Sequence, residues 1–191
     1  IFITDDPGEI RNVDCLIEFT LPDVTISHME IALKYKKPSV IGTTGFTDEQ
    51  KARLKEISNS IPVLLSPNMS IGVNTLFKLV NLGAGVLRDY KVSIIESHHI
   101  HKKDAPSGTA KRIAEIVKET SGKEVTDIKS IREDEIIGDH EIILDSEMDT
   151  IRLIHSAKNR DIFANGALEA AKWIIKKGHG IFDIKDMMRV D

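Results

Sequence analysis

The alternation of short apolar runs with helical segments over the first 65 residues is the feature that most constrains the fold of this chain. Three short runs are mostly apolar and bounded by polar or turn-forming residues, as buried strands are; they cover 14–19, 39–41 and 62–65. Segments with apolar residues at helical spacing separate them. Strands that alternate with helices through short connections predict a parallel sheet of the α/β class.

Local signals mark the limits of the two intervening helices. In the first, residues 24–37, Pro38 ends the apolar pattern, and we expect Thr20 to act as the N-cap. The second begins at Thr47-Asp48-Glu49-Gln50, which matches a capping box, and places Leu54 and Ile57 on one face. Both helices therefore have a defined place between the predicted strands.

The pattern changes beyond residue 68. A longer helix is predicted over 73–87, a strand over 91–97 and a helix over 108–119. Three strand-like pieces then follow one another near 126–132, 141–144 and 150–157, and a last helix over about 167–177 is closed by Gly178. Consecutive strands without intervening helices predict a second domain of α+β type, with a mixed or antiparallel sheet.

Composition narrows the class of protein. The chain has 26 basic and 30 acidic residues, a formal net charge of −4, so no global positive field recruits nucleic acid or an anionic membrane. No apolar run approaches the length of a membrane span. The single cysteine, Cys15, cannot form an intrachain disulfide, so a reduced, cytoplasmic setting is the expectation.

The most informative stretch for function runs from Glu96 to Ala110. It combines a strand end, a turn with groups that titrate near neutrality, and a helix N-terminus with hydroxyls and free backbone N–H groups. Such a helix start is suited to a carboxylate or phosphate. The residues alone leave three interpretations open: a solvated loop with a capped helix, a metal site built on His98, His99 and His101, and a catalytic anion-binding site.

A resemblance to a known family favours the third interpretation. The pattern Glu-Ser-His-His-x-x-Lys-x-Asp-Ala-Pro-Ser-Gly-Thr-Ala, residues 96–110, resembles the signature of dihydrodipicolinate reductases. Further segments resemble the family in the same order: 16–22, 40–45, 68–73 and 163–167. The resemblance covers essentially the whole chain.

The resemblance implies a fold and a reaction. Residues 1–68 and 164–191 would form an incomplete Rossmann-type domain that binds the dinucleotide, and residues 69–163 a substrate-binding and tetramerisation domain. The implied enzyme is a homotetrameric oxidoreductase of lysine and diaminopimelate biosynthesis. It would use NADH or NADPH to reduce 4-hydroxy-tetrahydrodipicolinate, a cyclic dicarboxylate, to tetrahydrodipicolinate.

The resemblance also assigns roles to individual residues. His98 and Lys102 would be the acid/base pair, with Lys102 the proton donor. The substrate carboxylates would be bound by His99, Lys102, Gly108 and Thr109. The nicotinamide end of the cofactor would contact two turns, largely through backbone atoms; these residues are Gly42, Thr43, Thr44, Ser66, Pro67, Asn68 and Met69. No metal is implied.

The chain departs from the family pattern at one place. The glycine pairs Gly83-Gly85 and Gly178-Gly180 lack a third glycine or alanine three positions on, so the sequence holds no dinucleotide fingerprint. We therefore expect that an N-terminal βαβ portion is missing. Two rival hypotheses remain: a non-catalytic dicarboxylate-binding or assembly fragment with a broken cofactor site, and a histidine-cluster metalloprotein.

Three further residues with polar, chemically active side chains lie outside these motifs. His140 is expected at the surface. His155 is expected to be structural or at a domain interface. Arg160 lies just before the last helix, and two interpretations stay open: a surface residue without a role, or a contact to a substrate carboxylate, which a guanidinium binds through two parallel hydrogen bonds.

Overall fold

The computed structural model describes residues 2–188, which fall into two compact units. One unit comprises Ile1–Ile71 with Phe163–Asp191, and the other comprises Gly72–Ile162. These are the first and the second unit, respectively. In the described part of the chain, no helix is both long enough and apolar enough to cross a membrane.

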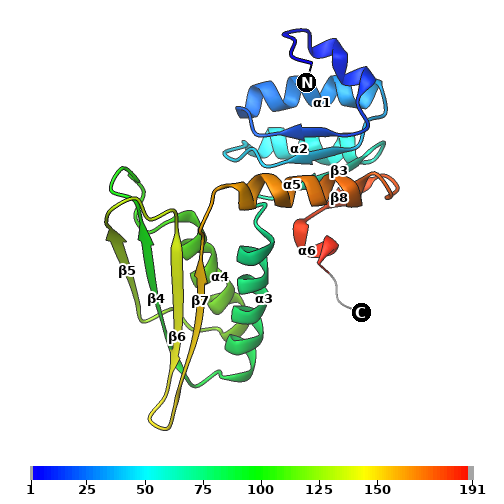
Figure 1. The fold of residues 1–191 in the computed structure, drawn as a ribbon. Coiled ribbons are helices and arrows are strands. Elements are labelled where there is room, and N and C mark those ends of the chain that lie inside the picture. The colour runs from blue at the N-terminus through cyan, green and yellow to red at the C-terminus, as the bar shows by residue number, and fades with distance from the viewer. Residues whose placement is uncertain (1, 189–191) are drawn as a thin grey trace. The chain divides into compact units, whose positions relative to one another are not determined.

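The first unit is built on a four-stranded parallel sheet (Figure 1). In spatial order its strands are β1 (Leu16–Glu18), β2 (Ser39–Ile41), β3 (Pro62–Leu65) and β8 (Gly180–Phe182). The helices of this unit are η1 (Pro7–Asn12, a 3-10 helix), α1 (Pro22–Lys34), α2 (Asp48–Ser58), α5 (Asp161–Ile174) and α6 (Ile184–Met187). This arrangement confirms the predicted parallel α/β sheet.

Two apolar clusters cover the two faces of this sheet. Val63 and Ile41 pack with residues of α1 and α2, including Met29 and Leu54. On the opposite face, Val40 and Leu64 pack with residues of α5, including Ala167, Ala170 and Ile174. Because neighbouring residues of a strand point to opposite faces, Val63 and Leu64 serve different clusters. The burial of β2 on both faces explains why this strand is wholly apolar apart from Ser39.

The helix starts in this unit test the predicted caps. The capping box at Thr47 is confirmed: its hydroxyl accepts from the N–H of Gln50, and the Gln50 side chain accepts from the N–H of Thr47. The cap predicted at Thr20 is wrong, because α1 begins at Pro22 after Leu21, without a side-chain cap. Pro22 has no N–H to satisfy at the first helical position, and the Thr20 hydroxyl donates to Glu18 instead.

The C-terminal elements differ from the prediction in two ways. Helix α5 begins at Asp161, six residues before the predicted start, includes Gly166 in its interior, and ends at Ile174, three residues before the predicted end. A Cβ atom at position 166 would lie 1.8 Å from the backbone oxygen of Met69, so only glycine allows this close approach. Strand β8 was not predicted, because a three-residue strand shows no usable periodicity.

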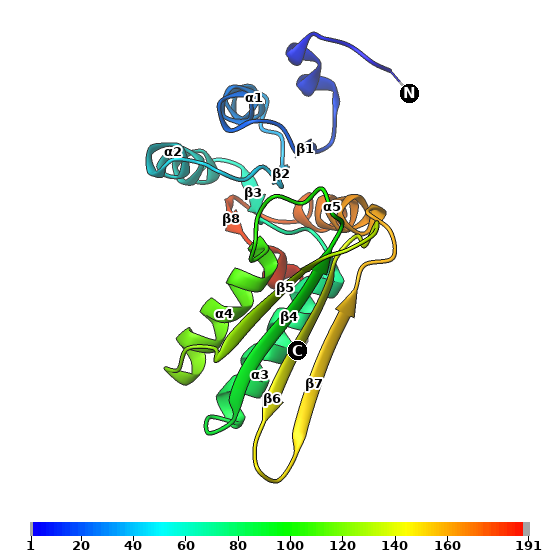
Figure 2. The ribbon, with the colours of Figure 1, turned by 90° about the vertical axis from the view of Figure 1, so that its left-hand side faces the viewer.

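The second unit pairs a mixed four-stranded sheet with two helices. The sheet order is β5 (Asp127–Arg132), β4 (Lys91–His98), β6 (Asp139–Asp145) and β7 (Thr150–Ser156). Strand β4 runs parallel to β5 and antiparallel to β6, which confirms the predicted mixed sheet. Helices α3 (Ile71–Val86) and α4 (Gly108–Ser121) both pack on one face (Figure 2).

The covered face of this sheet carries polar residues at one end. Along β4 every second residue is buried, in the series Val92, Ile94, Glu96 and His98. Val92 and Ile94 belong to the apolar core with α3 and α4. Alternation therefore places Glu96 and His98 on the same enclosed face, directly beyond the apolar core.

Candidate active site

A buried carboxylate lies at the carboxyl end of β4. Glu96 is 0% exposed, and its Oε2 lies 2.5 Å from Nδ1 of His98. The guanidinium of Arg132 donates to both carboxylate oxygens, at 2.8 and 3.0 Å. Arg132 is the last residue of β5 and is paired in register with His98, so the parallel strand pairing brings the three groups together.

The charges of this cluster follow from its surroundings. Burial opposes the charge of Glu96, but hydrogen bonds from Arg132, Ser130 and His98 outweigh it and lower the pKa of the carboxyl group to about 2. Burial also lowers the pKa of the His98 imidazole, although the hydrogen bond with Glu96 acts in the opposite direction. At neutral pH the site therefore contains the Glu96 carboxylate beside a neutral His98.

The turn after β4 brings Lys102 to the same end of the unit. Its Nζ donates to the Asp104 carboxylate at 2.7 Å, and this hydrogen bond lowers the pKa of the Asp104 carboxyl group. The Asp104 backbone oxygen accepts from Arg132 at 2.6 Å. His101 and Lys103, by contrast, are exposed.

His99 has a cationic neighbour from a distant part of the sequence. Nη2 of Arg160 lies 3.4 Å from Nε2 of His99, so the structure brings together two residues that are 61 positions apart. A carboxylate contact was one of the two interpretations open for Arg160, and its place beside His99 favours that hypothesis. No three His, Cys, Asp or Glu side chains within residues 2–188 are close enough together to hold a metal ion.

Helix α4 begins with unsatisfied donors. The Ser107 hydroxyl caps the helix by accepting from the N–H of Ala110 at 3.2 Å, and the N–H of Ser107 donates to Glu96 at 3.3 Å. Among residues 2–188, no acceptor reaches the N–H groups of Gly108 and Thr109. A Cβ atom at Gly108 would meet nothing within 4 Å, so no side chain of the described residues crowds the start of the helix at this residue. An anion fits there, because the helix dipole and the free N–H groups both favour negative charge.

The prediction that His140 lies at the surface is wrong. His140 is 4% exposed on β6, and its Nε2 lies 3.1 Å from the Ser107 hydroxyl. Burial, followed by the charge of nearby His98, lowers the pKa of its imidazole to about 4. The sequence offered a signal for this position, because His140 continues the buried series of Ile142 and Leu144.

Sequence reasoning missed the two residues that organise this cluster. Glu96 was quoted as part of the motif but given no role, although its place in the buried alternation of β4 could have revealed it. Arg132 lies 36 positions from Glu96, and nothing in the local sequence indicates that they pair. His98 and Glu96 came from one segment, whereas Arg132, His140 and Arg160 are brought in by the tertiary structure.

The residues expected to contact a nicotinamide lie in the first unit. They occupy the turns after β2 and β3, which leave the same edge of the sheet because these strands are parallel neighbours. The turns are held by backbone bonds from Gly42 to Glu18 and from Ser66 to Ile41. Thr44 and Pro67 are exposed, while Thr43 is buried and the Met69 side chain packs in the core.

A chain of hydroxyl groups supports the first of these turns. The buried Glu18 carboxylate accepts from Thr20 at 2.6 Å and contacts His28 at 2.8 Å. Thr20 is hydrogen-bonded to Thr25, and Thr25 to Thr43 at 2.8 Å. The Thr43 side chain is therefore fixed, and the neighbouring backbone with it.

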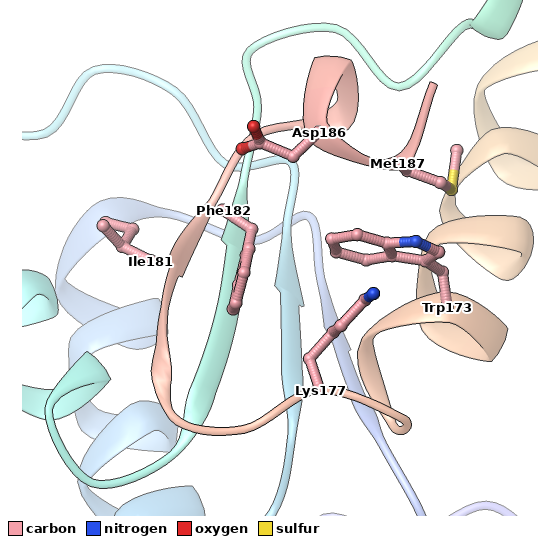
Figure 3. Close-up of a pocket in the computed structure, with 6 residues that line it drawn as sticks. All are labelled: Trp173, Lys177, Ile181, Phe182, Asp186 and Met187. Carbon is pink, nitrogen blue, oxygen red and sulfur yellow. The ribbon is translucent and has the colours of Figure 1, made fainter. Parts of the chain in front are cut away.

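The first unit also contains an open cavity of about 510 Å³ at the C-terminal end of α5 (Figure 3). Its wall includes the Trp173 and Phe182 rings, which pack edge to face at 5.4 Å, and Lys177 Nζ lies 4.4 Å from the centre of the Trp173 ring. None of the predicted site residues lines this cavity.

Comparisons with known proteins cover nearly the whole chain. The family model described as "Dihydrodipicolinate reductase, N-terminus" matches residues 1–69, and the model described as "Dihydrodipicolinate reductase, C-terminus" matches residues 72–188. Curated proteins named 4-hydroxy-tetrahydrodipicolinate reductase, from Syntrophus aciditrophicus (strain SB) and Ralstonia pickettii (strain 12J), are 38% identical over 98% of the chain. The chain covers 78% and 79% of their lengths.

Solved structures agree with these matches. The dipicolinate-bound dihydrodipicolinate reductase from Paenisporosarcina sp. TG-14 is similar with a TM-score of 0.79 and 27% identity. The match covers 90% of this chain and 72% of that one. An amine dehydrogenase from Mycobacterium smegmatis, 9% identical with a TM-score of 0.57, shares the fold alone.

Proposed function

Because the chain belongs to the dihydrodipicolinate reductase family, we propose that it reduces 4-hydroxy-tetrahydrodipicolinate to tetrahydrodipicolinate with NADH or NADPH, a step of lysine and diaminopimelate biosynthesis. The observation that carries this proposal is the cluster at the carboxyl end of β4. There a neutral histidine, a lysine and two free N–H groups occur in one segment that carries the family motif. Relatives matched over 98% of the chain are reductases, so a non-catalytic binding fragment is not favoured.

The substrate is a dicarboxylate, and the second unit offers two places for negative charge. We assign one carboxylate to the N–H groups of Gly108 and Thr109, where the helix dipole adds to the hydrogen bonds. His99 and Lys102 supply further donors, and Arg160 beside His99 adds a permanent cation. Fixing both carboxylates would hold the ring in one orientation, which lowers the entropy cost of reaching the transition state.

Two residues are assigned to proton movement. Lys102 is the proton donor to the reduced ring, because its ammonium group is already positioned by Asp104. His98 is neutral and can accept a hydrogen bond or a proton, while the neighbouring Glu96 carboxylate stays ionised. In the overall reaction the substrate gains a hydride and a proton and loses water.

NADH or NADPH supplies the hydride when bound. The described residues fit its nicotinamide end: two neighbouring turns at the carboxyl edge of a parallel sheet present exposed residues at Thr44 and Pro67. We assign Gly42, Thr43, Thr44, Ser66, Pro67, Asn68 and Met69 to this contact. The sequence contains no glycine-rich turn suited to the pyrophosphate, so these residues account for one end of the cofactor only.

We further propose that the protein is a homotetramer in the cytoplasm. The face of the second sheet opposite α3 and α4 has no described element of its own unit packed on it, and Ile154 on this face is 65% exposed. Glu141 and Arg152 form an ion pair on the same face. A sheet face of this kind is suited to self-association, which sedimentation velocity would test.

The direct test is an assay of NADH and NADPH oxidation with freshly generated 4-hydroxy-tetrahydrodipicolinate. Turnover that requires both the substrate and a reduced dinucleotide supports the proposal. Absence of turnover, in protein shown to be folded by circular dichroism, would contradict it for this chain. Binding of pyridine-2,6-dicarboxylate, measured in parallel by calorimetry, separates a failure of the substrate site from a failure of the cofactor site.

A further inference from the structure

The Glu96 carboxylate connects three segments of the second unit. It is fully buried and accepts hydrogen bonds from His98 in its own strand, from Arg132 at the end of β5 and from the backbone of Ser107 at the start of α4. Replacing a buried ion pair by well-packed apolar groups is often neutral or stabilising, so stability alone does not explain a charged pair at this point. The role of the Glu96–Arg132 pair therefore lies in the groups that its hydrogen bonds hold in place.

We propose that the Glu96–Arg132 ion pair is the positioning element of the active site, which sets the tautomer of His98 and the path of the turn that carries Lys102. This inference rests on the proposed function for its catalytic consequence. Its structural content, the tautomer and the turn, holds independently of any reaction.

The first branch of the proposal concerns the tautomer of His98. A neutral imidazole whose Nδ1 faces a carboxylate must carry its proton on Nδ1, because a carboxylate only accepts. The lone pair is then on Nε2, which is the atom left for a substrate or a proton. Gly138 keeps this atom accessible, since a Cβ atom at that position would lie 3.0 Å from Nε2.

The second branch of the proposal concerns the position of Lys102. Arg132 donates at once to Glu96 and to the backbone oxygen of Asp104, at 2.6 Å. The side chain of Asp104 in turn binds the Lys102 ammonium at 2.7 Å. Glu96 also fixes the other end of the turn through the N–H of Ser107. The place of Lys102 therefore depends on the same ion pair as the tautomer of His98.

The variant Glu96→Gln gives a sharp test of the first branch. At either oxygen position the new amide NH2 group would face a donor of Arg132, but at Oε1 it would also face the N–H of Ser107. It is therefore expected at Oε2, beside His98, whose Nδ1 must then accept, and the imidazole proton moves to Nε2. Nitrogen-15 NMR of the imidazole distinguishes the two tautomers, with the His98 signals assigned by their loss in His98→Gln.

The expected results separate the two branches. Wild-type protein shows the Nδ1–H tautomer; Glu96→Gln shows the Nε2–H tautomer and loses about 10²–10⁴-fold in kcat, with a much smaller change in KM. Arg132→Lys keeps the Nδ1–H tautomer but also loses turnover, because lysine lacks the planar two-nitrogen fork that binds both Glu96 oxygens and the Asp104 oxygen at once. Glu115→Gln and Arg112→Lys, in an exposed ion pair of α4, are the matched controls and leave both readouts unchanged.

Two results would overturn the proposal. An Nε2–H tautomer in the wild-type protein excludes the first branch without any variant, which keeps the test decisive if Glu96→Gln does not fold. Unchanged turnover in a folded Glu96→Gln or Arg132→Lys variant excludes a positioning role. If instead the tautomers are as expected and the wild-type protein is inactive, the role of Glu96 in setting the His98 tautomer stands and the proposed function fails.

Discussion

Replacement of Lys102 by alanine tests the assignment of the proton donor. The ammonium group is held at 2.7 Å from Asp104, in a pair whose side chains are 23% and 51% exposed. A positioned general acid contributes about 10²–10⁴ in rate, which corresponds to about 3–5 kcal/mol of activation free energy. A partly exposed ion pair contributes only about 0–1 kcal/mol to stability. We therefore expect Lys102→Ala to lose two to four orders of magnitude in kcat while its urea midpoint hardly moves.

The neighbouring Lys103 provides the matched control. It lies in the same turn and has the same charge, but it is exposed and forms no ion pair with a carboxylate of the described residues. Steady-state oxidation of NADH or NADPH is followed at 340 nm for both variants, with stability measured by urea unfolding. Lys103→Ala should behave as the wild-type protein. Turnover by Lys102→Ala within a few-fold of wild type would refute the assignment of Lys102, and a large loss of stability would refute the estimate for the ion pair.

Three further predictions concern the fold, the pH dependence and the ligand. Gly166→Ala should lower the free energy of unfolding by about 1–3 kcal/mol through overpacking against Met69, whereas Gly178→Ala, where a Cβ meets nothing within 4 Å, should not. The pKa of His140 falls from its usual 6.5 to about 4 on folding; the unfolded chain therefore binds more protons, and stability is lost as pH falls from about 6.5 to 4. The pH dependence of the urea midpoint across this range should be weaker in His140→Asn and unaltered in His179→Asn; an equal pH dependence in all three proteins contradicts the low pKa of His140. Arg160→Ala should weaken binding of pyridine-2,6-dicarboxylate about tenfold or more in calorimetry, and an unchanged affinity would remove Arg160 from the site.

The sequence by itself determined the elements that local physics controls. Apolar runs at 39–41 and 62–65, with helical spacing between them, were enough to predict a parallel sheet, and the capping box at Thr47 marked a helix start correctly. The same was true of the mixed sheet in the second unit. The motif from Glu96 to Ala110 was contiguous, so a resemblance within one segment was sufficient to identify the family.

Only the tertiary structure decided which distant groups meet. Arg132 reaches Glu96 because β5 pairs with β4 in one register, and His140 is buried because β6 pairs on the other side. The last helix was predicted to begin at about residue 167, but α5 contains Gly166 in its interior, where the close approach of the Met69 backbone leaves no room for a Cβ atom. Capping and periodicity act over a few residues, whereas strand register and close packing join positions far apart in the chain, and no local pattern records them.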